Sequence, residues 1–245
     1  MPGVGVLTPG SPGAASSGRS LACALMSQSD HYFTAQPASA GEQRTLTVCL
    51  AGRQLSVRTA PGIFSPDGLD KGTAVLLREV PDPPATGDLL DLGCGWGPVA
   101  LTLALLSPGA RVWAVDVNER SLALAQANAR SLGAEGVHAV RPEDVPDDVR
   151  FAAIWSNPPI RVGKAVLHEM LLTWLPRLEA GGTAYLVVQK NLGSDSLQRW
   201  LAEQLPAGEF TVSRYASDKG FRVLAVTRAE VTPDEVTPAE VRPGS

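Results

Sequence analysis

The sequence predicts an α/β fold: a seven-stranded, mainly parallel sheet with helices on both faces. Two observations predict it. Short apolar strands alternate with helical segments through most of the chain, an order that is typical of parallel sheets covered on both sides. The last two strands are joined by a turn too short for a crossover, so they must form an antiparallel pair.

The individual elements follow from local patterns. Alternating apolar and polar residues predict a β-hairpin from strands 45–50 and 54–58, and residues 70–77 are predicted to form a helix with Asp70 as its N-cap. The later strands are predicted at residues 88–92, 111–115, 137–140, 151–155, 183–189, 210–214 and 221–227. The helices between them are predicted at residues 98–106, 119–132, 164–178 and 195–205.

Composition divides the chain into four parts. Residues 1–29 are rich in Gly, Pro, Ala and Ser and predict a disordered leader, within which Met26 is an alternative start of translation to Met1. Residues 30–60 form an N-terminal β-hairpin extension, and residues 61–229 form the main domain. Residues 230–245 repeat proline at every fifth position and predict a disordered, acidic tail.

Composition also limits the class of function. The net charge of −4 gives no sign of a nucleic-acid binder at the level of the whole chain, and no apolar run has the length of a membrane span. Three cysteines without metal-ligand spacing are typical of a reducing, cytoplasmic compartment. The histidines His31, His138 and His168 are equally scattered, so no metal site is predicted.

The first chemical motif is a glycine-rich turn at residues 91–97, DLGCGWG, between a strand and a helix. Glycine allows the backbone to turn sharply and to approach a ligand closely. The dinucleotide fingerprint needs Gly or Ala at the next position, where Pro98 stands, so an NAD oxidoreductase is disfavoured. Asp116 ends the following strand, where a carboxylate can accept both hydroxyls of a ribose; Val117 and Asn118 would border the adenine.

The second motif is Asn157-Pro158-Pro159, which follows the apolar strand 151–155. An exocyclic amine on a base is a weak nucleophile, because its lone pair is delocalised into the ring. The Asn157 side-chain oxygen and the Pro158 carbonyl can accept hydrogen bonds from such an amine and aim its lone pair. The two prolines have a fixed φ and hold these acceptors rigidly. This motif therefore predicts methyl transfer to nitrogen, with Asn157, Pro158 and Pro159 as the catalytic group.

From residue 62 to residue 228 the chain resembles the methyltransferase small domain family, and within it the small-subunit rRNA guanine-N2 methyltransferases. The resemblance rests on residues 64–73 (FSPDGLDKGT), 91–97, 156–160 (SNPPI) and 219–223 (KGFRV). It implies the Rossmann-like class I methyltransferase fold, S-adenosyl-L-methionine as cofactor and cytoplasmic rRNA methylation. Guanine N2 of 16S rRNA is the implied acceptor, and rRNA or the small ribosomal subunit the implied partner.

The resemblance also implies roles for single residues. The cofactor site would comprise Phe64, Lys71, Gly72, Thr73, Asp91, Gly93, Cys94, Gly95, Asp116, Val117, Asn118, Asp144, Val145 and Asn157. Asp144, in preference to Glu143, would accept the adenine amine. Bacterial relatives usually have Phe after the two prolines, where its ring can stack on a flipped base, but Ile160 stands here. Ile160, Arg161 and Phe221 are the expected substrate contacts, with Lys164, Lys190, Lys219 and Arg222 as further candidates for phosphate contact.

Three alternatives stay open. Protein glutamine N5 methylation uses the same Asn-Pro-Pro chemistry, usually with Tyr next, and adenine N6 methylation shares that preference for an aromatic residue. A module that binds S-adenosylmethionine without turnover is the third, and the intact Asn157-Pro158-Pro159 argues against it.

Overall fold

The computed structural model describes residues 42–230. The predicted leader, and the predicted tail from residue 231 onward, lie outside the described residues.

Seven strands form one sheet in the order β5-β4-β3-β6-β7-β9-β8. Five strands, β3 to β7, pair in parallel, whereas β9 runs antiparallel between β7 and β8. The bounds are β3 Thr86–Leu92, β4 Gly109–Val115, β5 Val137–Val140, β6 Phe151–Ser156, β7 Leu178–Gln189, β8 Phe210–Asp218 and β9 Phe221–Arg228. The predicted fold class is confirmed. The chain order reverses at β3, which has β4 on one side and β6 on the other, and such a switch point opens a crevice at the carboxyl ends of the strands.

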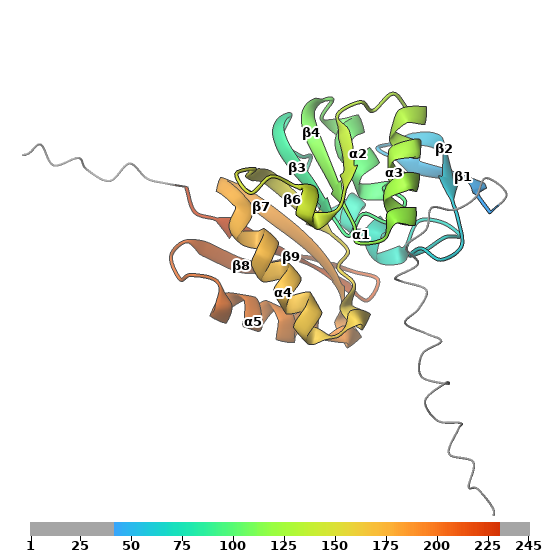
Figure 1. Ribbon diagram of the computed structural model, residues 1–245. Helices are drawn as coiled ribbons and strands as arrows, with labels where there is room; N and C mark the ends of the chain where they lie inside the picture. The colour runs from blue at the N-terminus through green and yellow to red at the C-terminus, as the bar shows by residue number, and fades with distance from the viewer. Residues whose placement is uncertain (1–41, 231–245) are drawn as a thin grey trace, which may run out of the picture.

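Helices cover both faces of the sheet (Figure 1). One face carries α1 Lys71–Glu79, α2 Pro98–Leu106 and α3 Glu119–Ser131, together with the hairpin of β1 Arg44–Leu50 and β2 Arg53–Thr59. The other face carries α4 Lys164–Trp174 and α5 Ser194–Gln204. Among residues 42–230, no helix combines the length and apolar character that crossing a bilayer requires.

Successive residues of the central strands belong in turn to two separate hydrophobic cores, one on each face of the sheet. Leu89 packs with α2 and α3, whereas its neighbour Leu90 packs on the side of α4 and α5. Successive side chains of a strand point to opposite faces, so the nearly continuous apolar runs of the central strands suit a sheet buried on both sides.

Three predicted boundaries were wrong. The helix predicted at 164–178 ends at Trp174, because Pro176 lacks an N–H and the chain continues as the short 3-10 turn η3 Leu175–Arg177. Strand β7 therefore begins at Leu178, and not at residue 183 as predicted. The strand predicted at 210–214 continues to Asp218 across a bulge between Arg214 and Ala216.

Candidate functional site

The glycine turn lies where β3 ends and α2 begins. Gly93, Gly95 and Gly97 have φ of 81°, 55° and 92°, a region that other residues rarely adopt. The backbone N–H groups of Gly93 and Cys94 both donate to the Val115 carbonyl, at 2.8 and 3.0 Å, which fixes the turn to the end of β4. A Cβ added at Gly93 or Gly95 would meet no atom within 4 Å, so the space above the turn is open.

Two carboxylates lie beside the glycine turn, and each accepts backbone hydrogen bonds there. Asp91 is 1% exposed, and its Oδ2 accepts the Ala100 N–H of α2 at 2.8 Å. Burial, with a smaller contribution from the charge of Asp116, raises the pKa of Asp91 to about 8. Asp116 accepts the N–H of Gly95 on Oδ2 and that of Asn118 on Oδ1, both at 2.9 Å, and burial raises its pKa as well.

The Asn-Pro-Pro segment leaves the neighbouring strand tip. Ser156, the last residue of β6, donates from Oγ to the Leu92 carbonyl at 2.7 Å, so the ends of β3 and β6 are held together. The Pro158 carbonyl accepts the Ile160 N–H at 2.8 Å, and Pro159 between them has φ −75° and ψ 74°, an inverse γ-turn. One lone pair of the Pro158 carbonyl is therefore occupied within the chain, and the second is left for a ligand.

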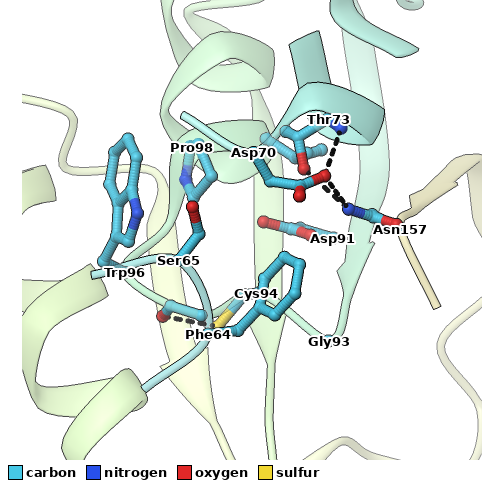
Figure 2. A pocket seen from close by; sticks show the side chains of 12 residues that line it. Phe64, Ser65, Asp70, Thr73, Asp91, Gly93, Cys94, Trp96, Pro98 and Asn157 are labelled. Carbon is cyan, nitrogen blue, oxygen red and sulfur yellow. Dashed lines mark hydrogen bonds between the residues drawn. The ribbon is translucent and has the colours of Figure 1, made fainter. Parts of the chain in front are cut away.

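A cleft of about 740 Å³ opens at these strand ends, a size typical of ligand sites. A smaller pocket adjoins it, and the two share Phe64, Asp70, Gly93 and Asn157 as lining residues (Figure 2). Ten of the predicted site residues line the cleft: Phe64, Gly93, Asp116, Val117, Asn157, Pro158, Pro159, Ile160, Arg161 and Phe221. Four more line the smaller pocket: Thr73, Asp91, Cys94 and Gly95.

Five predicted residues lie on neither wall: Lys71, Gly72, Asn118, Asp144 and Val145. Val145 is 3% exposed and packs in the core beside α4 and α5. The Asn118 side chain caps α3 by accepting the N–H groups of Arg120 and Ser121. The ligand roles of these residues stay predictions.

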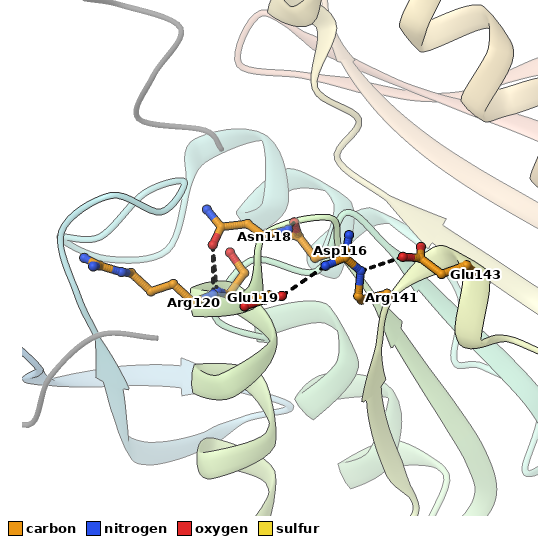
Figure 3. A network of polar contacts seen from close by, with 7 residues as sticks. Asp116, Asn118, Glu119, Arg120, Arg141 and Glu143 are labelled. Atoms are coloured by element: carbon orange, nitrogen blue, oxygen red, sulfur yellow. Dashed lines mark hydrogen bonds and ion pairs between the residues drawn. The ribbon is translucent and has the colours of Figure 1, made fainter. Parts of the chain in front are cut away.

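The loop after β5 contains the acids considered for the adenine amine. Glu143 is bonded to Arg141 at 2.6 Å, and Arg141 also contacts Glu119 at 3.0 Å (Figure 3). Asp144 is exposed at the end of the 3-10 turn η1 Pro142–Asp144, while Pro142 lines the cleft. Glu143 is therefore already paired, and the role of Asp144 at the adenine amine stays a prediction.

One candidate for phosphate contact is already paired within the chain. The Arg222 side chain is 15% exposed, forms an ion pair with Asp195 and donates to Ser194 Oγ at 3.2 Å. Its charge is thus balanced by Asp195 between β9 and α5.

Sequence reasoning missed one wall of the cleft and one polar residue. Val166, Met170 and Thr173 line the cleft from α4, at a helical spacing that would have indicated a shared face. Asp70, expected only as a helix cap, also lines both cavities and contacts Asn157 across 87 residues of sequence. No local pattern signals such a contact.

The chain is similar in sequence to known proteins. The model of the methyltransferase small domain matches residues 54–225. A Bacillus subtilis protein described as uncharacterized, YbxB, is 32% identical over 178 residues, which are 71% of this chain and 89% of that protein. A ribosomal RNA small subunit methyltransferase C from Aeromonas hydrophila is 38% identical over 133 residues, 53% of this chain but only 37% of the relative.

A solved structure shares the fold and part of the sequence. The Thermus thermophilus 16S rRNA N2 G1207 methyltransferase, in complex with AdoMet and guanosine, superposes with a TM-score of 0.64 and 25% identity. The match covers 78% of this chain and 52% of the Thermus chain, so this chain spans about half of that structure. With the family model matched over most of the chain, the sequence belongs to the methyltransferase small domain family.

Proposed function

We propose that the chain is an S-adenosylmethionine-dependent methyltransferase that modifies guanine N2 in small-subunit rRNA. The observation that carries this proposal is the juxtaposition of the open glycine turn at β3 with Asn157-Pro158 at the adjoining tip of β6, linked by the bond from Ser156 to Leu92. Such a juxtaposition brings a donor of a methyl group and an exocyclic amine to neighbouring strand ends.

The residues along the cleft fit the cofactor. The positions of Gly93 and Gly95 leave room for a ligand against the backbone. Asp116 accepts backbone N–H groups, among them those of Gly95 and Asn118 on separate oxygens, and a carboxylate offers about four acceptor positions, so acceptor capacity remains for a ribose hydroxyl. Val117 is 55% exposed beside it and offers an apolar surface to an adenine ring. When bound, S-adenosylmethionine supplies an electrophilic methyl group.

The chain's own part in the reaction is to align the amine. The Asn157 side-chain oxygen and the remaining lone pair of the Pro158 carbonyl accept the two N–H bonds of the target nitrogen, whose own lone pair then points away from both acceptors. Alignment of this kind supplies much of the rate of a transfer between two bound groups. The nitrogen becomes acidic once it is methylated, so its proton can pass to water without a strong general base.

Guanine is favoured as acceptor by the relatives. The Thermus protein is named as an N2 methyltransferase of 16S rRNA and was solved with guanosine, and the Aeromonas protein is named for the small-subunit rRNA. Ile160, Met170 and Phe221 give the cleft apolar side chains beside Asn157, a suitable environment for a flipped base.

Nucleoside mass spectrometry of small-subunit rRNA tests the proposal. A strain that lacks this chain should lose one N2-methylguanosine, and purified chain with labelled cofactor should restore it in subunits from that strain. A release factor with a target glutamine is assayed beside the RNA. Label in the release factor with none in the RNA would contradict the assignment and favour protein glutamine methylation.

A further inference from the structure

The side-chain amide of Asn157 is held by two residues of the segment that begins α1. Its Nδ2 donates to Asp70 Oδ2 at 2.8 Å and to Thr73 Oγ1 at 3.0 Å. Figure 2 shows the amide nitrogen directed at Asp70 and the amide oxygen directed away from it. Both N–H bonds of the amide are therefore used within the chain, and its oxygen is left for the cleft.

The Asp70 carboxylate fixes the orientation of this amide. An ionised carboxylate only accepts hydrogen bonds, whereas a threonine hydroxyl can accept or donate. If the amide were rotated by a half turn, its oxygen would face the Asp70 carboxylate and its N–H groups would face the incoming amine. An amine that donates cannot be held by another donor, so the rotated amide would be unable to align it.

The placement of Asp70 is itself fixed by the helix. The same Oδ2 atom accepts the N–H of Gly72 at 2.7 Å and of Thr73 at 3.1 Å, so the N-cap of α1 and the contact to Asn157 share one oxygen. Three donors converge on this atom, which leaves the carboxylate little freedom to turn away.

Gly72 gives an independent sign of the same close approach. Glycine in a helix costs roughly 0.5–1 kcal/mol relative to alanine. A Cβ at this position would lie 2.9 Å from Asp70 Oδ2, 3.1 Å from Phe221 Cε1 and 3.3 Å from Asn157 Nδ2. The first turn of α1 can therefore reach Asn157 only because residue 72 has no side chain.

We propose that Asp70 and Thr73 are positioning residues that fix the Asn157 amide with its oxygen presented to the target amine. This inference rests on the proposed function. It assigns to residues 64–73 a task in the alignment of the substrate, in addition to their expected place in the cofactor site. Asp70 and Thr73 act through Asn157 and need not touch the reacting atoms.

Two substitutions separate this task from helix capping and packing. Asp70→Ser keeps a good N-cap, but its hydroxyl is too short to reach Asn157 and is no longer restricted to accepting. Thr73→Val keeps the volume and the backbone bond to Asp70 but removes the hydroxyl. We expect turnover to fall by about tenfold or more in Asp70→Ser and by a smaller factor in Thr73→Val, since misalignment affects the transfer step. Cofactor affinity should change by less than about threefold in Asp70→Ser; it is no control for Thr73→Val, because Thr73 lies among the residues expected at the cofactor. Thr73→Ser should recover turnover relative to Thr73→Val.

Thr102→Val is the matched control. Thr102 is also a buried helical threonine, and its hydroxyl donates to the Pro98 carbonyl within α2. It should lose stability as Thr73→Val does and keep its turnover. In an Asn157→Ala background, Asp70→Ser should change the residual turnover by less than about twofold, because residues that act through one partner are not additive.

A second readout does not depend on turnover. In ¹⁵N-labelled protein, the two Nδ2 protons of Asn157 should exchange slowly with solvent in the wild type and rapidly in Asp70→Ser. Equal exchange rates, or an equal loss of turnover from Asp70→Ser with and without Asn157, would overturn the positioning role. The wild type could leave rRNA unlabelled while the Nδ2 protons of Asn157 still exchange more slowly in it than in Asp70→Ser. The proposed function would then be wrong, whereas the positioning of the Asn157 amide by Asp70 would remain supported.

Discussion

At the scale of single residues, the site is built around acidic side chains that the fold buries. Asp91 precedes the glycine turn and accepts an N–H from the first turn of α2. Asp116, which follows β4, accepts the Gly95 N–H of the glycine turn. Gly97 cannot cap α2 with a side chain, so Asp91 supplies an acceptor for α2 from a neighbouring strand. The turn is thereby rigid at the place where the cofactor is proposed to lie.

The raised pKa of Asp91 predicts a specific pH dependence of stability. Folding raises this pKa from its usual 3.8 to about 8, so the folded state holds the proton more tightly than the unfolded chain does. The resulting stabilisation is fully present below about pH 4 and is lost as the pH rises through 8. Asp91→Asn keeps an acceptor for Ala100 but cannot titrate.

Denaturant unfolding of both proteins between pH 5 and pH 8.5 measures this effect. The free energy of unfolding of the wild type should fall relative to that of Asp91→Asn by up to a few kcal/mol, at about 1.4 kcal/mol per pKa unit. Parallel curves for the two proteins would show that Asp91 has an ordinary pKa in the fold.

At the scale of elements, one side chain docks the N-terminal hairpin on the main domain. Asn128 of α3 is fully buried; its Oδ1 accepts the Arg58 N–H at 2.7 Å, and its Nδ2 donates to the Arg58 carbonyl at 2.9 Å. It also donates to the Trp96 carbonyl in the glycine turn at 3.0 Å. The amide thus bonds to both backbone groups of Arg58, as a neighbouring strand would, and links the hairpin to the glycine turn.

Removal of this amide should be costly. Asn128→Ala leaves three backbone groups without their partner, and a buried polar group without a bond costs about 1–3 kcal/mol. We expect the free energy of unfolding to fall by about 2–4 kcal/mol in total, since the groups can partly relax. Ser131→Ala on the same helix removes only a local bond to the Asn128 carbonyl and should change stability by less than about 0.5 kcal/mol. Similar stability of the two variants would refute the docking role.

How far the sequence predicts these elements depends on how local their signals are. The strands and helices were found because apolar periodicity is local, and the turn at 91–97 and Asn157-Pro158-Pro159 are contiguous motifs. The end of α4 was misjudged because apolar residues continue through Pro176 into β7. The contact between Asp70 and Asn157 joins distant segments and depends on how α1 packs on the sheet, which no periodicity encodes.

At the scale of the whole molecule, charge limits how the protein can hold its substrate. The chain carries a net charge of −4, and Arg222 is already paired with Asp195 beside the cleft. Arg161 lines the cleft, but few cations of the described residues converge there. Phosphate contacts alone would therefore give weak binding to RNA, and the shape of an assembled particle would have to add to it.

We expect the protein to prefer assembled subunits as substrate. Methyl transfer to small subunits should be faster than transfer to the same RNA after removal of its proteins. Each phosphate contact steepens the fall of log affinity with log salt by about 0.9. Because few such contacts are expected, the rate on subunits should depend only weakly on salt. Equal rates on naked RNA with a steep salt dependence would contradict this view of binding.

The central claim is that Asn157 aligns the amine while the cofactor lies on the glycine turn, so binding and turnover are separable. The measurement is cofactor affinity by calorimetry and single-turnover methyl transfer to subunits, on one preparation each of wild type and Asn157→Ala. We expect the cofactor affinity of Asn157→Ala to lie within about threefold of wild type and its turnover to be lower by a factor on the order of 100, since misalignment alone costs that much. Full turnover in Asn157→Ala, or a parallel loss of cofactor binding, would contradict it.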